Sequence, residues 1–206
     1  MRISALFAAV ALAFGATFTP ILGPQALAEP LSTEDALAER VLGDATAPVE
    51  MIEYSSLTCP HCAAFHVEKL PELKKKYIDT GKLRLIQRDF PFDQPGAMAA
   101  MMARCANPMR YHQFIDVLFK QQAQWSRADN PAAALAQTGK LGGLSEKDFQ
   151  ACMQKEDLLN GILQMRQQGV ADYEISSTPT FIINGEKIVG NQSLETFEEA
   201  IEKHLK

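Results

Sequence analysis

The sequence predicts an α/β fold in which a helical subdomain interrupts the chain of a small sheet. A strand–helix–strand pattern that begins at Val49 and a β-hairpin pattern around Asn184-Gly185 predict the sheet. The long stretch between them has the residue pattern of several helices and predicts the subdomain.

Residues 1–28 are predicted to be a cleaved signal peptide. Arg2 is the only charged residue before Glu29, and an apolar run covers Ile3 to Phe18. Ala26-Leu27-Ala28 then places small residues at the positions that a signal peptidase reads. We therefore expect export to the periplasm, an oxidising compartment in which disulfides persist.

The composition narrows the classes of function. The chain has 206 residues and a formal net charge of −5, and no cluster of basic residues stands out. This acidic balance argues against binding to nucleic acid or to anionic membranes. The part after the signal peptide is long enough for one domain with an added subdomain.

Residues 29–48 are predicted to be a short N-terminal segment. Ser32 and Asp35 have the spacing of a capping box, which predicts a helix of one to two turns from Ser32 to Val41. Gly43 to Pro48 then has the composition of a linker into the core.

The first half of the sheet domain is expected at residues 49–95. Val49–Tyr54 has the pattern of a buried strand, and Lys82–Phe90 that of a second one. A helix from Pro60 to Thr80 lies between them, with a kink expected at Pro71. Because the links are tight, the two strands should be parallel and joined by a right-handed crossover.

Residues 96–172 are predicted to form an inserted helical subdomain. The expected helices are Gly96–Ala106, Met109–Gln124, Pro131–Leu141, Ser145–Gln154 and Glu156–Val170. We expect this subdomain to enlarge the surface beside the functional site and to help grip unfolded polypeptide.

The second half of the domain is expected at residues 173–206. Thr180–Ile183 and Lys187–Val189 flank Asn184-Gly185, a strong signal for a two-residue hairpin turn, and an amphipathic helix from Leu194 to Leu205 follows. The order β-α-β followed by β-β-α is that of a thioredoxin fold. The predicted fold class is therefore α/β, a thioredoxin fold with an inserted α-helical subdomain.

Cys59-Pro60-His61-Cys62 carries the predicted chemistry. Cys59 stands at the start of a helix, where unpaired N–H groups and the helix dipole stabilise a thiolate. Cys62 lies one turn deeper and can close a disulfide with Cys59. His61 can donate a hydrogen bond or positive charge to the thiolate. A thiolate stabilised in this way makes the disulfide easy to transfer, so the motif predicts thiol–disulfide exchange.

The other two cysteines, Cys105 and Cys152, lie on predicted helices of the insertion. An exported protein with an even number of cysteines usually pairs them, so we expect a structural disulfide. Such a link would add up to about 4 kcal/mol on the chain-entropy model. Tuning of the Cys59–Cys62 pair from a distance and two buried free thiols are the alternatives.

The chain resembles the DsbA family of exported disulfide oxidoreductases. The resemblance lies in Val49–Tyr54, Cys59-Pro60-His61-Cys62, Arg88-Asp89-Phe90-Pro91, Thr178-Pro179-Thr180-Phe181 and Asn184-Gly185. It implies that Cys59 is the nucleophile, that Cys62 is the resolving thiol, and that Pro179 follows a cis peptide bond facing both. Thr178 departs from the Val of the best-known members, and its backbone is expected to pair with a substrate segment.

The resemblance also implies a role for Glu53 and a set of partners. Thioredoxin-like proteins place a buried acid at this point, so Glu53 is a candidate proton acceptor for Cys62; the alternative is an edge-strand Glu that faces water. The implied substrates are folding exported proteins with free cysteines, and the implied reoxidising partner is a quinone-linked membrane oxidase of the DsbB kind. No organic cofactor and no metal is expected.

Two rival functions remain at this stage. A disulfide isomerase or reductase would share the motif, but the short segment before the core favours a monomeric oxidase over a dimeric isomerase. A soft-metal chaperone would use Cys59, Cys62 and His66, which share one helix, although a structural zinc site usually needs four ligands. His66 is otherwise expected to be a surface or packing residue.

Overall fold

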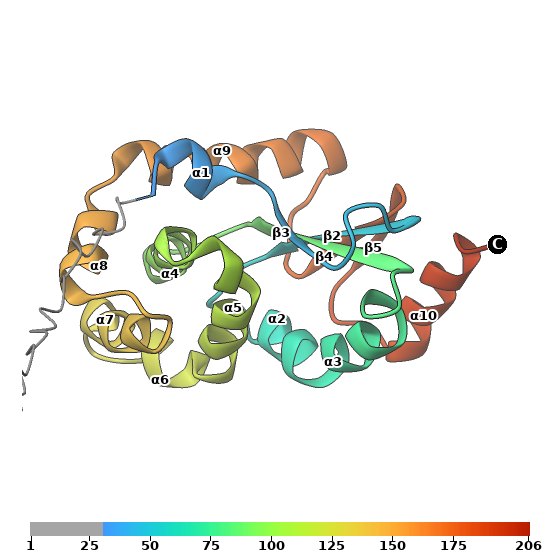
Figure 1. Ribbon diagram of the computed structural model, residues 1–206, viewed down its shortest axis with the longest axis horizontal. Helices are drawn as coiled ribbons and strands as arrows, with labels where there is room; N and C mark the ends of the chain where they lie inside the picture. Colours follow the sequence, from blue (N-terminus) through green and yellow to red (C-terminus); the bar gives the residue numbers. More distant parts are fainter. Residues whose placement is uncertain (1–30) are drawn as a thin grey trace, which may run out of the picture.

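The computed structural model describes residues 31–206 and contains a five-stranded mixed sheet with the strand order β1-β3-β2-β4-β5 (Figure 1). The strands are β1 (Arg40–Leu42), β2 (Val49–Ser55), β3 (Leu83–Asp89), β4 (Thr180–Ile183) and β5 (Glu186–Val189). The predicted signal peptide, residues 1–28, lies outside the described residues.

The central strands have the pairing that the sequence predicts. β2 runs parallel to β3, from Val49 opposite Leu83 to Ser55 opposite Asp89. β4 is antiparallel to β2 and forms the hairpin with β5. The predicted fold class, a thioredoxin fold with added helices, is confirmed.

The N-terminal segment differs from the prediction. Helix α1 covers only Thr33–Leu37, and Arg40–Leu42 forms β1, which pairs antiparallel with β3. The Ser32 hydroxyl caps α1 by accepting from the Asp35 N–H, as the capping-box spacing predicts. Pairing of Arg40–Leu42 with β3 gives these residues sheet hydrogen bonds and covers an edge of β3 that would otherwise be open.

One face of the sheet is covered by the long helical segment after the cysteines and by α10 (Leu194–Lys203) (Figure 1). The segment comprises α2 (Pro60–Ala64), η1 (Phe65–Lys69), α3 (Leu70–Leu73) and η2 (Lys74–Ile78). Phe65 packs on Phe181 of β4 and on Phe197 of α10, with ring centroids 4.5 and 5.3 Å apart. This aromatic cluster anchors the helix that carries the cysteines.

That segment is interrupted by π-helical turns around the predicted kink. Pro71 has no N–H, and just before it the Leu70 N–H bonds to the carbonyl of Phe65, five residues back. A proline ring also crowds the carbonyl four residues earlier, so the wider turn accommodates it.

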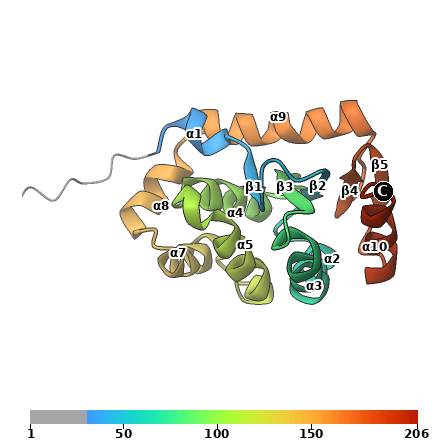
Figure 2. The same ribbon diagram turned by 45° about the vertical axis from the view of Figure 1, so that its right-hand side comes forward.

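The opposite face of the sheet is covered by α9 (Glu156–Tyr173) (Figures 1 and 2). Gly169 of this helix lies against Tyr54, and a Cβ atom at Gly169 would come within 2.5 Å of the tyrosine ring. Tyr54 also packs with Phe90, Ile175 and Ile182 in a small apolar cluster. The close approach of α9 therefore depends on a residue without a side chain.

The insertion forms a helical subdomain with its own core, seen beside the sheet in Figure 2. Its elements are α4 (Gln94–Cys105), η3 (Pro108–Arg110), α5 (Tyr111–Lys120), α6 (Gln122–Ser126), α7 (Pro131–Leu141), α8 (Glu146–Met153) and the first half of α9. A disulfide with an S–S distance of 2.00 Å joins Cys105 of α4 to Cys152 of α8. Within residues 31–206, no helix is both long and apolar enough to span a membrane.

A buried ion pair joins the subdomain to the sheet. The Arg104 guanidinium of α4 contacts the Asp89 carboxylate at the end of β3, and both side chains are at most 3% exposed. The same guanidinium donates to the backbone carbonyls of Ala36 and Ala38. Arg104 therefore ties the insertion, the sheet and the N-terminal segment together.

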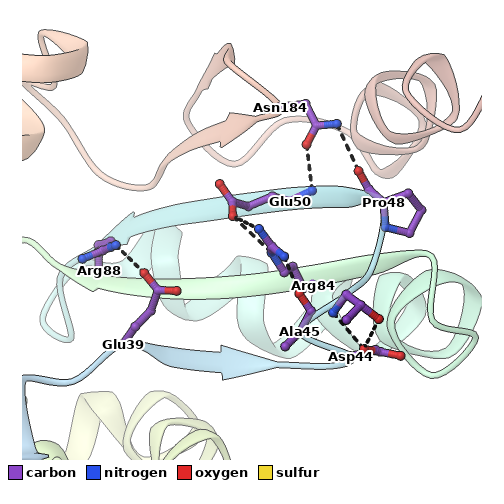
Figure 3. A network of polar contacts seen from close by, with 9 residues as sticks. Glu39, Asp44, Ala45, Pro48, Glu50, Arg84, Arg88 and Asn184 are labelled. Atoms are coloured by element: carbon purple, nitrogen blue, oxygen red, sulfur yellow. Dashed lines mark hydrogen bonds and ion pairs between the residues drawn. The ribbon is translucent and has the colours of Figure 1, made fainter.

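A second polar network crosses the outer part of the sheet (Figure 3). Arg84 of β3 pairs with Glu50 of β2 and donates to the carbonyl of Ala45. In the hairpin turn, the Asn184 carboxamide accepts from the Glu50 N–H at 2.8 Å and donates to the carbonyl of Pro48. Asn184 has a φ of 43°, a left-handed conformation in which asparagine is enriched. This one residue therefore forms the turn and also holds the start of β2.

We predict that Arg104→Ala destabilises the protein by about 3–5 kcal/mol, because it leaves the Asp89 charge buried and unpaired. Urea unfolding of the reduced protein provides the measurement. Arg88→Ala is the matched control, since its pair with Glu39 is partly exposed and should contribute only about 0–1 kcal/mol. Equal losses in the two variants would contradict this assignment.

Candidate active site

The two cysteines of the Cys59-Pro60-His61-Cys62 motif differ sharply in their surroundings. Cys59 is the N-cap residue of α2, with φ −77° and ψ 120°, and its side chain is half-buried. Cys62 lies one turn further along and is fully buried. Both are free thiols in this structure, which therefore shows the reduced pair. An attacking thiol can reach Cys59 but not Cys62.

The pKa of Cys59 is lowered to about 5. The largest cause is a hydrogen bond from the Cys62 thiol, and the Thr178 side chain and the backbone N–H groups of Cys62 and His61 add to it. Partial burial acts in the opposite direction. The start of α2 thus holds Cys59 as a thiolate at neutral pH, as the position of the motif predicts.

The pKa of Cys62 is raised well above the ordinary value of a thiol. Burial is the largest cause, followed by the hydrogen bond to Cys59 and by the negative charge of Glu53. Cys62 is therefore protonated at neutral pH. Cys59 is therefore suited to be attacked or to leave as a thiolate, while Cys62 keeps its proton.

The loop before β4 lies against Cys59. The Cys59 Sγ is 3.3 Å from the backbone carbonyl oxygen of Thr178, although the two residues are far apart in sequence. The peptide bond between Thr178 and Pro179 is cis. The structure thus brings together Cys59, Cys62, Thr178 and Pro179, four of the residues singled out in the sequence.

His61 lies in the first turn of α2, directly before Cys62. Its side chain is exposed, and its contribution to the lowered pKa of Cys59 comes through the backbone N–H. The effect of its imidazole ring on the Cys59 thiolate remains a prediction.

Glu53 is buried in the middle of β2, so the alternative of an edge-strand residue facing water does not hold. Its carboxylate oxygens lie 2.9 and 3.1 Å from Nε2 of His66. His66 is only 4% exposed, so of the two expected roles, surface or packing residue, the surface role is wrong. The sequence held a signal for this pair, because His66 follows the buried Cys62 by one helical turn and a buried imidazole needs a polar partner.

Gln122 of α6 is a site residue that the sequence gave no reason to select. Its side-chain Nε2 donates to the carbonyl of Leu57 at 2.8 Å and to that of Cys59 at 2.9 Å. The first short helix after α5 therefore holds the loop that presents Cys59. Nothing in the sequence of an inserted helix reveals which backbone carbonyls it will face.

The same loop is also fixed from α4. The Thr58 hydroxyl donates to Asp93 at 2.9 Å, and Asp93 caps α4 by accepting from the Gly96 N–H at 2.7 Å. A Cβ atom at Gly96 would lie 2.9 Å from the Asp93 carboxylate and 3.1 Å from the Thr58 hydroxyl. The subdomain thus fixes the active-site loop from two helices.

The side chains described around the two cysteines are not arranged as a metal site. In the part of the chain that the structure describes, no group of three or more His, Cys, Asp or Glu side chains is arranged to hold a metal ion. His66, the third ligand proposed from the sequence, turns its Nε2 to Glu53.

Comparison with known proteins places this site in a family. Residues 35–203 match a family model described as Thioredoxin. The solved structure of alpha-DsbA1 from Wolbachia pipientis is 32% identical and superposes with a TM-score of 0.75, over 80% of this chain and 89% of that one. This chain belongs to the DsbA family.

Relatives of this DsbA chain have names that refer to disulfide chemistry. A putative protein-disulfide oxidoreductase of Rickettsia conorii is 36% identical over 169 residues, which are 81% of this chain and 60% of that relative. This DsbA chain thus spans about three fifths of the length of that relative. Disulfide bond formation protein D of Bacillus subtilis is 25% identical over 180 residues, covering 81% of this chain and 77% of the relative.

We predict that Cys59 in the reduced protein ionises with a pKa of about 5. Thiolate absorbance at about 240 nm, followed from pH 3 to pH 9, measures it. Cys62→Ala should move this pKa upward, because it removes the largest cause of the shift, whereas Cys59→Ala should abolish the transition. A transition near the ordinary thiol value of about 8.5 in the wild-type protein would contradict the prediction.

Proposed function

We propose that this chain is an exported dithiol oxidase that donates the Cys59–Cys62 disulfide to folding proteins with free cysteines. The observation that carries the proposal is the asymmetry of the pair: Cys59 is accessible with a pKa of about 5, and Cys62 is buried with a raised pKa. Stabilising the reduced pair makes the disulfide more oxidising.

The proposed reaction begins with attack of a substrate thiolate on the Cys59 sulfur. The Cys59–Cys62 bond breaks, a mixed disulfide forms at Cys59, and Cys62 leaves and takes up a proton, as its raised pKa favours. A second substrate thiolate then attacks the substrate sulfur, and Cys59 leaves as a thiolate. Two electrons pass from the substrate to the cysteine pair, and no organic cofactor or metal takes part.

The surroundings suggest how substrate is held and how the cycle closes. The Thr178–Pro179 loop beside Cys59 is the proposed support for the substrate backbone, and the helical subdomain is the proposed additional gripping surface. By analogy with DsbA proteins, a quinone-linked membrane oxidase of the DsbB kind would restore the disulfide. Export through the predicted signal peptide would bring a monomeric protein to the periplasm, with Cys105–Cys152 as a structural link.

Redox strength separates an oxidase from a reductase. DsbA has a reduction potential of about −120 mV and thioredoxin one of about −270 mV. At about 1.4 kcal/mol per 30 mV, this gap amounts to roughly 7 kcal/mol. The lowered pKa of Cys59 supports placing this pair toward the oxidising end.

Transfer to a reduced peptide with two cysteines tests the proposal. The oxidised protein should convert one equivalent of peptide to its disulfide and release the reduced pair, with free thiols and masses measured over time. Cys62→Ser and Cys59→Ser cannot form the Cys59–Cys62 disulfide, so each should leave the reduced peptide unoxidised.

The matched control is the double variant Cys105→Ala, Cys152→Ala, which should retain transfer if that disulfide is structural. A wild-type protein that leaves the peptide reduced and equilibrates with glutathione as thioredoxin does would favour a reductase and contradict the oxidase assignment.

A further inference from the structure

A buried ion pair lies beneath the cysteines and has no part in the steps above. Nε2 of His66 is 2.9 Å from one carboxylate oxygen of Glu53, and the two side chains are 2% and 0% exposed. Glu53 comes from the central strand β2, and His66 from the first π-helical turn after α2. The pair therefore spans the contact between the sheet and the helix that carries Cys62.

Among residues 31–206, His66 is the side chain that forms an ion pair with Glu53. Beside Glu53 on the sheet, β3 contributes the uncharged Gln87 and β4 the apolar Phe181. No Lys or Arg of residues 31–206 forms an ion pair with Glu53, and His66 does. A carboxylate in such a place is costly unless a cation faces it, and otherwise takes up a proton.

The surroundings of His66 favour its charged form. Burial alone would lower the pKa of His66, but Glu53 and Asp116 raise it to about 9. Asp116 of α5 lies 3.9 Å from Nδ1 and is 45% exposed, and the Phe119 ring packs on the imidazole with centroids 4.3 Å apart. Burial lowers the pKa of the neighbouring His112, and the charge of His66 lowers it further.

Glu53 in turn acts on the resolving thiol. Its negative charge is one of the causes that raise the pKa of Cys62, so the carboxylate and the thiol interact inside the protein. Cys62 must lose its proton before it can attack a mixed disulfide at Cys59. A nearby carboxylate can take that proton only while the carboxylate is ionised.

We propose that His66 is a positioning residue for thiol–disulfide exchange, whose cationic ring keeps Glu53 ionised so that Glu53 can accept the Cys62 proton. In the balanced step, the Cys62 S–H proton passes to Glu53 and the Cys62 sulfur attacks Cys59. The Cys59–Cys62 bond forms, the bond from Cys59 to the bound thiol breaks, and that thiol leaves as a thiolate. Glu53 then releases its proton to solvent. The inference rests on the proposed function only in assigning Cys62 as the resolving thiol.

The proposal predicts a specific change in pH dependence. With His66 in place, the ion pair favours the charged form of Glu53. His66→Gln retains a hydrogen-bonding side chain but removes the charge, so burial should then favour the protonated form of Glu53. Resolution by Cys62 should then slow as the pH falls.

Reaction of the reduced full-length protein with one equivalent of Ellman's reagent separates the two thiols. The first release of nitrothiobenzoate reports attack by Cys59, and the second reports resolution by Cys62. In His66→Gln we expect an unchanged first phase and a second phase slowed at least ~10-fold at pH 6, converging with wild type near pH 9; general-base catalysis contributes about 10²–10⁴-fold.

The Glu53→Gln background provides the matched control. Adding His66→Gln to Glu53→Gln should have no further effect on the second phase, because the group on which His66 acts is gone. A second phase in His66→Gln with the wild-type rate and pH profile would overturn the proposal. So would an unchanged second phase in Glu53→Gln, a near-isosteric variant that keeps the proposal falsifiable even if His66→Gln does not fold.

Failure of the oxidase assignment gives a different result. A wild-type protein that does not oxidise the dithiol peptide contradicts the proposed function, yet its two phases with Ellman's reagent still measure the role of His66. Conversely, normal peptide oxidation with an unaltered second phase in His66→Gln rejects only the positioning role.

Discussion

Stabilisation of a thiolate at the first turn of α2 is the interaction on which the rest of the site depends. The hydrogen bond from Cys62 and the N–H groups that begin the helix lower the pKa of Cys59 to about 5. A neutral disulfide sulfur gains far less from these donors than a thiolate does. Interactions that stabilise the thiolate favour the reduced pair, which would make the disulfide a better donor.

A thiolate stabilised in this way needs an active-site loop of fixed geometry. The helical subdomain holds that loop in place. Gln122 of α6 holds two carbonyls of the loop, and Asp93 at the start of α4 holds Thr58. Arg104 anchors the same subdomain to the end of β3. The helical subdomain is thus part of the framework of the active site, as well as a surface beside it. Burial of Cys62 between this framework and the sheet produces the unequal pair.

The sequence was informative wherever a local rule applied. Strand patterns, the hairpin turn at Asn184 and the position of Cys59 before a helix predicted the sheet and the reactive thiol, because periodicity and helix ends depend on neighbouring residues. β1 was missed because three residues carry little pattern and form a strand only when β3 offers an edge. Gln122 and the partner of His66 depend on contacts between distant segments. His66 could have been selected, since it lies one turn after the buried Cys62; Gln122 could not.

The most direct test compares the free energies of unfolding of the reduced and oxidised forms in urea at pH 7, with Cys105–Cys152 kept intact in both. A disulfide ordinarily stabilises a protein by restricting its unfolded chain. If the folded protein favours the Cys59 thiolate over the Cys59–Cys62 bond, the reduced form will have the larger free energy of unfolding. An oxidised form that is the more stable of the two would contradict the account.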